Sequence, residues 1–342
     1  MYQENKVMIP LKRKRMLHNT NNLTVRSTRL KIQWLLCGCM LFFGATLGAQ
    51  SEAMYSQYMN NMIIINPAYA GSRAGDNITS LSRIQWVNVV GAPRSFSLSW
   101  DRGSEDIVEG LHQTFTPVSY GLQLYSDQLG IETSQGFQAF YAYRIKFYNS
   151  MLSFGVSAGA MSYRAAYSQV TTIQGGDQVF QEDVSAILPT VGMGAMYATT
   201  NWYVGLSAPA LLKTSIKNNQ YQVTAAANSY YFLTGGYIFD VSDNLKLKPS
   251  LLLKAIQAEP IHVDINLNAW IQNTVGLGIS YRGNSDMVGM FQVRVTPQIT
   301  LGYAYDYQTT YLNTFSSGSH ELLLRFEFNR PKNQFFISPR YY

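Results

Sequence analysis

Few residues of this chain have the types and spacing that catalysis needs. His262 and Asp264 are two positions apart in an alternating segment, so their side chains share one face of a predicted strand. A carboxylate beside an imidazole can orient it for proton transfer, as in a hydrolase embedded in a membrane. No nucleophile is marked near the pair, which favours the alternative of a polar pair in the interior of a β-structure.

Two other local patterns are also weak candidates for a site. The pair His320-Glu321 follows a Ser-Ser-Gly-Ser sequence, which indicates a contact at a loop or at the start of a strand. The Gly-Gly-Asp sequence at 175–177 is more typical of a turn than of a calcium site. The chain has neither a GxxxxGK[ST] phosphate loop nor an HExxH zinc motif. We therefore predict no catalytic residue, no metal site and no cofactor.

The first 49 residues have the pattern of a signal peptide. Basic residues are followed by an apolar run at Trp34–Phe43 and then by small residues, which predicts cleavage between Ala49 and Gln50. Both cysteines of the chain, Cys37 and Cys39, fall inside this segment, so disulfides and thiolate metal sites are excluded from the mature protein. Removing 8 of 26 Lys+Arg and 1 of 20 Asp+Glu leaves 18 − 19 = −1. This balance gives no support to a nucleic-acid partner.

Alternation of apolar and polar residues dominates the rest of the chain. Phe137, Tyr141 and Tyr143 share one apolar face, for example, while Gln138 and Arg144 point the other way. Most such segments have about 9–14 residues, which suits a tilted strand crossing a bilayer better than the strand of a soluble sandwich. The sequence therefore predicts an all-β fold, a transmembrane outer-membrane β-barrel of about 14 antiparallel strands within residues 77–329. The predicted strands are 79–88, 93–101, 117–126, 134–147, 151–164, 188–199, 202–210, 229–239, 245–256, 261–272, 274–282, 287–296, 298–307 and 319–329.

The connectors between these segments alternate in length. Those at Tyr148–Ser150 and Asp240–Asn244 are tight, whereas those at Ala165–Ile187 and Leu211–Asn228 are long. Short periplasmic turns and longer external loops are typical of outer-membrane barrels, and an even number of strands leaves both termini in the periplasm. The connector at Arg102–Thr116 is long on the predicted periplasmic side, so it is either functional or a misplaced boundary.

Charged residues fall on the polar faces of the predicted strands. Because charge is costly on the lipid face, these side chains are expected to line the interior of the barrel. They either pair across strands and fill the interior, or form a polar conduit or hold a plug. The candidate interior charges are Arg144, Lys246, Lys248, Asp264, Arg294, Asp306, Arg325 and Glu327.

Ten sequence blocks in this order resemble the PorP/SprF family of type IX secretion system membrane proteins. They are YSQYMNNMIIINPAYAG (55–71), IQWVNVVGAPRSFSLSWD (84–101), DQLGIETSQGFQAFYAYRI (127–145), LSFGVSAG (152–159), WYVGLSAPALL (202–212), GGYIF (235–239), LKPSLLLK (247–254), GLGISYR (276–282), LGYAYDY (301–307) and SSGSHELLLRF (316–326). The resemblance implies an outer-membrane barrel that serves type IX export and, in some members, gliding motility. It also implies work with an exported adhesin or with periplasmic machinery.

The segment 50–76 precedes the first predicted strand and contains the turn-forming sequence Asn-Pro-Ala-Tyr-Ala-Gly. One hypothesis is that it only leads the chain into the first strand, tucked into the barrel mouth. The other is that it is a periplasmic docking element with aromatic anchors. The candidate docking residues are Tyr55, Tyr58, Asn66, Pro67, Tyr69 and Gly71, and the tail 330–342 is a second candidate contact.

The leading hypothesis is a non-enzymatic outer-membrane component of type IX secretion. Its expected partners are outer-membrane lipid, the secretion machinery or a periplasmic lipoprotein, and an exported surface adhesin. The alternative is a diffusion channel or uptake barrel with a charged interior.

Overall fold

The computed structural model describes residues 54–328, apart from positions 74, 104–105, 110–111, 116, 170–182, 213, 218–223, 228, 257–259 and 284–285. The chain divides into two units, Met1–Leu47 and Gly48–Tyr342, and the fold is that of the second unit. The predicted signal peptide (1–49), the Gly-Gly-Asp turn (175–177) and the C-terminal tail (330–342) lie outside the described residues. In the part of the chain that is described, no helix combines the length and apolar character needed to cross a membrane.

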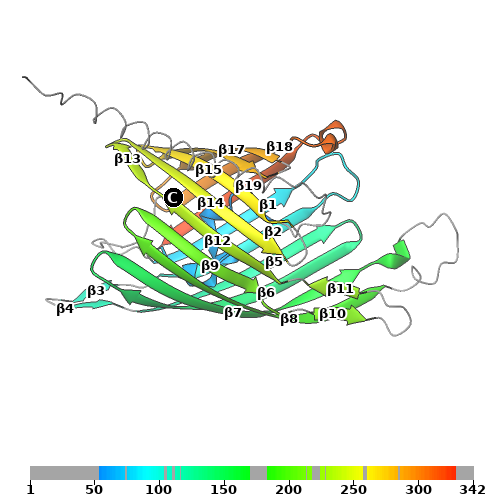
Figure 1. Ribbon diagram of the computed structural model, residues 1–342, viewed down its shortest axis with the longest axis horizontal. Helices are drawn as coiled ribbons and strands as arrows, with labels where there is room; N and C mark the ends of the chain where they lie inside the picture. The colour runs from blue at the N-terminus through cyan, green and yellow to red at the C-terminus, as the bar shows by residue number, and fades with distance from the viewer. Residues whose placement is uncertain are drawn as a thin grey trace, which may run out of the picture. The chain divides into compact units, whose positions relative to one another are not determined.

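One antiparallel sheet closes on itself to form a barrel (Figure 1). Its first and last strands pair from Asp76↔Phe328 to Ile84↔His320. The ring is completed by pairing of β12 with β14, and β13 (Phe239–Ser242) continues β12 along β14. The described residues thus form a closed ring of fourteen strands, which confirms the predicted fold. These strands are β1 (Asp76–Ile84), β2 (Arg94–Arg102), β5 (Val118–Leu129), β6 (Glu132–Lys146), β7 (Ser150–Ala165), β8 (Val184–Thr199), β9 (Trp202–Ala210), β12 (Tyr230–Tyr237), β14 (Leu245–Ile256), β15 (His262–Ile271), β16 (Val275–Arg282), β17 (Asp286–Arg294), β18 (Ile299–Gln308) and β19 (Ser319–Phe328).

Most strand boundaries lie within a few residues of the predicted ones, and the first strand differs most. It was expected at 79–88, but β1 ends at Ile84, because Trp86 and Asn88 adopt φ values of 45° and 78° that a strand cannot contain. The long connector after Arg102 contains a separate hairpin of β3 (Asp106–Glu109) and β4 (His112–Phe115). A second hairpin, β10 (Thr214–Lys217) with β11 (Thr224–Ala227), lies between β9 and β12.

The connectors define two ends of the barrel. We call the end with the connectors 85–93, 130–131 and 309–318 the loop end. We call the opposite end, with the connectors 147–149, 200–201 and 243–244, the turn end. A three-residue turn, 272–274, joins β15 to β16 at the turn end. Gln272 and Asn273 have φ values of 50° and 53°, and the Thr274 amide donates to the Ile271 carbonyl over 3.0 Å. This is the left-handed turn geometry that matches the twist of a tight hairpin.

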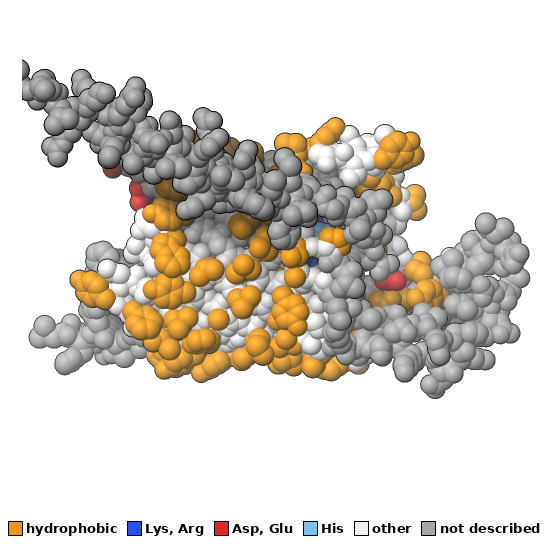
Figure 2. Space-filling model, viewed as in Figure 1, with side chains coloured by type: hydrophobic (Ala, Val, Ile, Leu, Met, Phe, Trp, Pro, Cys, Tyr) orange, Lys and Arg blue, Asp and Glu red, His pale blue; other side chains and the backbone are white. Residues whose placement is uncertain are grey.

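Apolar side chains cover the outer face of the barrel that is visible in Figure 2. Along β15, Ile265, Leu267 and Ile271 are exposed, whereas the alternating Asp264 and Asn266 are buried. This inside-to-outside inversion, with apolar residues outside and polar residues inside, is what a lipid-facing strand requires.

The Leu267→Arg variant tests the lipid-facing assignment. Leu267 lies near the middle of β15 and is exposed on the outer face. An arginine at the bilayer midplane costs about 2–4 kcal/mol, so we expect the free energy of unfolding in liposomes, measured with urea, to fall by that amount. The control is Val90→Arg, at a fully exposed side chain of the loop 85–93, which should change stability by less than about 0.5 kcal/mol. Equal effects of the two substitutions would contradict the assignment.

Candidate functional site

The interior of the barrel is occupied by the residues that precede β1 (Figure 1, blue). We call residues 54–73 the plug. It folds into three short 3₁₀ turns, η1 (Tyr58–Asn60), η2 (Met62–Ile64) and η3 (Pro67–Tyr69). Asn66 caps the third turn by accepting a hydrogen bond of 2.9 Å from the Ala68 amide, and Pro67 occupies the first position of the turn, where no amide donor is needed. The turn chemistry that the sequence predicted therefore shapes the plug.

A buried ion cluster holds the plug near the loop end. The Arg83 guanidinium pairs with the carboxylates of Asp306 at 2.6 Å and Glu321 at 3.2 Å, and all three side chains are at most 1% exposed. The Glu321 carboxylate accepts hydrogen bonds from the amides of Ser56 at 2.6 Å and Gln57 at 2.8 Å. The Ser56 hydroxyl donates to Asp306 and accepts from Arg83. The plug backbone therefore completes the coordination of charges that the wall supplies.

Further wall side chains bind the backbone of the plug along its length. Arg282 of β16 donates to the Tyr55 carbonyl over 2.8 Å, and Arg325 of β19 donates to the Asn60 carbonyl over 2.8 Å. Ser207 of β9 donates to the Ile65 carbonyl over 2.8 Å. These bonds satisfy carbonyl groups of non-helical backbone that would otherwise be costly to bury.

At the turn end, a second set of contacts closes the plug onto the wall. The Gly71 amide donates to the Asp101 carboxylate over 2.8 Å, and Arg144 donates to the Ala70 carbonyl. Arg73 pairs with Glu327 over 3.0 Å. The same end of the barrel also carries the tight hairpins, so the plug is fixed directly before the chain enters β1 at Asp76.

The wall approaches the plug most closely at two glycines. A Cβ atom on Gly155 of β7 would collide with the Ala68 nitrogen and the Pro67 carbonyl carbon. A Cβ atom on Gly194 of β8 would collide with the side-chain oxygen of Asn66, whose amide donates to the Ala195 carbonyl over 3.1 Å. Only glycine permits backbone to approach this closely. The wall is therefore fitted to the Asn-Pro-Ala turn.

Apolar contacts complement these polar ones. Tyr58, Met59 and Ile65 of the plug form one buried cluster with wall residues that include Phe232 and Leu252. The polar end of Tyr58 also has a partner, because the Asn266 amide donates to its hydroxyl over 2.7 Å. Apolar packing and hydrogen bonding thus act on the same side chains.

The plug runs through the barrel in one direction. Ser56 contacts Glu321 and Asp306 near the loop end, and Arg73 contacts Glu327 at the turn end. Phe328, the last residue of β19, also lies at the turn end. The first described residues of the chain thus lie at the loop end and the last at the turn end. That both termini are periplasmic stays a prediction, because residues 50–53 and 329–342 lie outside the described part of the chain.

The predicted docking residues are all in the plug. Tyr55, Tyr58, Asn66, Pro67 and Gly71 are buried, and Tyr69 is half-buried. A partner would reach them only by entering the barrel or displacing the plug, so docking by these residues remains a prediction.

The predicted interior charges divide into two groups. Lys246 and Arg294 are half-buried near the turn end, where Lys246 pairs with Asp240 over 2.6 Å. The other members of the set are buried inside the barrel: Arg144, Lys248, Asp264, Asp306, Arg325 and Glu327. Four of these, Arg144, Asp306, Arg325 and Glu327, bind the plug. The interior charges mainly hold a segment of the chain itself.

Sequence reasoning missed Arg83, Asp101 and Glu321 as plug ligands. Arg83 and Asp101 lie on the inner face of predicted strands, so the alternation could have marked them. Glu321 was considered only as a contact at the start of a strand. No local signal indicated which backbone amides these side chains would bind.

The candidate catalytic residues have structural partners. Asp264 forms an ion pair with Arg282 at 3.5 Å, and His320 shares a hydrogen bond of 2.7 Å with the Tyr303 hydroxyl. Within the described ranges, no group of three or more His, Cys, Asp or Glu side chains is placed to hold a metal ion.

Comparison with known proteins gives one family match. The family model of the type IX secretion system membrane protein PorP/SprF matches residues 47–326. Comparison with curated proteins gives no match.

Several solved structures resemble the barrel distantly. The Acinetobacter baumannii outer membrane protein Omp33 is 10% identical with a TM-score of 0.42, over 75% of this chain and 100% of that chain. The Ralstonia pickettii toluene transporter TbuX is 9% identical with a TM-score of 0.46, over 78% and 93%. The CymD monoaromatic hydrocarbon channel is 12% identical with a TM-score of 0.45, over 82% and 95%.

Proposed function

Because this chain belongs to the type IX secretion system membrane protein PorP/SprF family, we propose that it is a non-enzymatic outer-membrane component that docks exported adhesin cargo or periplasmic secretion machinery. The observation that carries this proposal is the family match across residues 47–326, which spans nearly all of the described barrel. Support for export or surface attachment of cargo, and for gliding motility as in some relatives, belongs to the same proposal.

We further propose that the turn end faces the periplasm, since short periplasmic turns are typical of outer-membrane barrels. In this orientation Phe328 and the β3–β4 hairpin face the periplasmic machinery, while the loop end and Met54 face outward. A lipoprotein or machinery component would then meet the turn end, and cargo in transit to the surface would meet the loop end.

A diffusion channel or uptake barrel is the second candidate function. The sequence supported a channel only through its charged interior. In the structure, several of those charged side chains bind the plug. Channel function would therefore require displacement of residues 54–73. Single-channel conductance measurements separate the two functions, because a barrel that stays plugged carries no steady current.

Deletion of the gene tests the proposed function. We expect the cell-surface and culture-supernatant proteomes of the deletion strain to lose one or a few large adhesins, and complementation with the wild-type gene to restore them. Loss of all type IX cargo would instead mark a core machine part. An unchanged proteome would contradict the proposal and favour the channel.

A further inference from the structure

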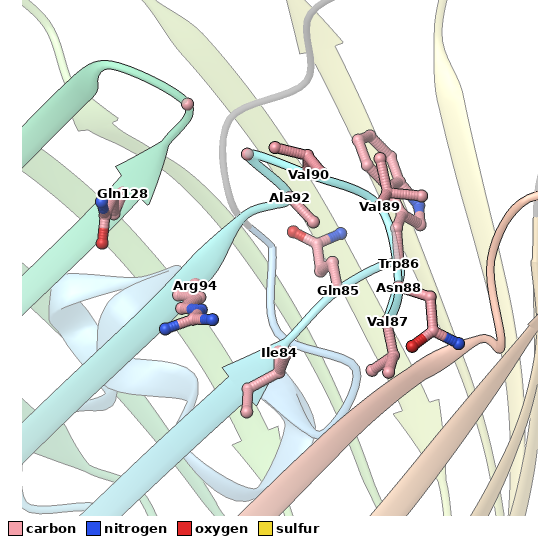
Figure 3. Close-up of a pocket in the computed structure, with 12 residues that line it drawn as sticks. Ile84, Gln85, Trp86, Val87, Asn88, Val89, Val90, Ala92, Arg94 and Gln128 are labelled. Carbon is pink, nitrogen blue, oxygen red and sulfur yellow. The ribbon is translucent and has the colours of Figure 1, made fainter.

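A cavity lies on the outer face of the barrel at the loop end, on the other side of the wall from the plug (Figure 3). Its volume is about 460 Å³, and it lies under the loop that joins β1 to β2. Ile84, Arg94 and Gln128 contribute side chains from three neighbouring strands, and Val89, Val90 and Ala92 contribute from the loop.

The three strand residues form one row across the outer face. Arg94 pairs in register with Ile84 of β1 on one side and with Gln128 of β5 on the other. Arg94 is exposed, the next residue Ser95 is buried, and Phe96 is again exposed at 44%. Since alternate residues of a strand face opposite sides, Arg94 points outward above the apolar band of β2. Its guanidinium therefore lies at the boundary between the apolar wall and the polar rim.

Hydrogen bonds fix the loop over this row. The Val87 amide donates to the Gly318 carbonyl and the Ser317 amide donates to the Val87 carbonyl, each over 2.9 Å. The Gly130 amide donates to the Gly91 carbonyl over 2.8 Å. Trp86 and Asn88 are held with positive φ, a strained conformation that persists only where the surroundings impose it. The loop 85–93 that covers the cavity is therefore held in place before any ligand binds.

The charge in this cavity is not neutralised by a neighbouring carboxylate. Arg94 forms no ion pair with any residue in the described part of the chain. Arg164 offers the contrast, since it also points outward at the loop end but pairs with Asp183 over 3.2 Å. The Arg94 guanidinium lies at the membrane boundary, beside apolar surface and the exposed amide of Gln128. Such a cation can bind the charged group of an anionic amphiphile.

We propose that Arg94, Gln128 and the loop 85–93 form a binding site for a phosphate group, with the acyl chain of a phosphorylated lipid along Phe96 and Leu98. Arginine presents a planar fork of donors that matches phosphate oxygens in two parallel hydrogen bonds. The Gln128 amide supplies a further donor, and the exposed side chains of Phe96 and Leu98 supply the apolar wall below. The site is separate from the plug and does not depend on the proposed function.

The test is lipid retention by the purified mature protein, measured by native mass spectrometry in detergent. The probes are diphosphoryl lipid A, its dephosphorylated form and inorganic phosphate. We expect the Arg94→Gln variant to retain diphosphoryl lipid A about tenfold to a hundredfold more weakly than the wild type, as for loss of a charge-assisted hydrogen bond. The Arg164→Gln variant, matched in charge and rim position, should bind like the wild type.

The outcomes separate the site from general surface charge. Competition by millimolar inorganic phosphate would support a phosphate site that also takes the free anion, and no competition would support a site specific for lipid. Equal retention by wild type and Arg94→Gln would overturn the proposal, as would equal loss in Arg164→Gln or equal binding of the dephosphorylated lipid. Retained heat-modifiable electrophoretic mobility shows that both variants are folded barrels.

Discussion

Replacing Gly155 by leucine is expected to drive the plug out of the barrel and to convert a closed barrel into a conducting one. A side chain at this position would occupy the space of the Ala68 nitrogen and the Pro67 carbonyl carbon. Overpacking of a core typically costs about 1–3 kcal/mol when side chains can adjust. Here the obstacle is backbone held between β7 and β8, so displacement of the turn is the available relief.

Two measurements follow this displacement. Single-channel recording in planar bilayers should show steady current for Gly155→Leu and none for the wild type. A cysteine introduced at Ala68, which is fully buried, should react with a soluble thiol reagent only in the Gly155→Leu background. The predicted mature chain has no cysteine of its own, so the label reports this position alone.

Gly289 provides the matched control for this experiment. It lies on the outward-facing side of β17, and a Cβ atom there meets nothing within 4 Å. Gly289→Leu should therefore leave the barrel closed and the cysteine at position 68 protected. A closed, protected Gly155→Leu barrel would show that the plug does not sit against β7 as described.

Replacing Arg83 by methionine is expected to lower the free energy of unfolding by about 3–5 kcal/mol, the usual cost of removing one partner from a buried ion pair. The substitution leaves Asp306 and Glu321, neither of them exposed, without the guanidinium that pairs with both. It also removes the donor to the Ser56 hydroxyl. The loss is measured by urea unfolding in liposomes.

Two further variants sharpen the experiment. Arg164→Gln removes an exposed ion pair with Asp183 and should cost less than about 1 kcal/mol. Adding Asp306→Asn and Glu321→Gln to Arg83→Met should recover part of the loss, because the carboxylates are then neutral. An Arg83→Met variant as stable as Arg164→Gln would rule out the ion cluster as an anchor of the plug.

The strands were predictable because their signal is local. A strand that faces lipid on one side must alternate apolar and polar residues with period two, and its length must match the bilayer. The type of each residue, for example Phe137 or Gln138, therefore indicates whether its side chain faces lipid or the interior. The strand count and most boundaries followed from this rule alone. The boundary at Ile84 did not follow, because apolar residues continue to Val90 while the backbone turns away at Trp86.

The positions of the charged residues were predictable, but their partners were not. Alternation placed Arg144, Asp306, Arg325 and Glu327 on inner faces without naming their partners. A conduit, cross-strand pairing and a plug all remained consistent with that placement.

The plug itself was decided by tertiary structure. Local chemistry specified a turn at Asn66–Pro67, but not that it would lie inside the barrel against Gly155 and Gly194. The contacts that settle this join residues far apart in sequence, such as Ser56 with Glu321, 265 positions away. The residue pattern of neither segment indicates the other as its partner, because these contacts form only when the ring closes between β1 and β19. The sequence by itself determined a lipid-facing wall of strands, and only the closed barrel determined that its charged interior binds the start of the same chain.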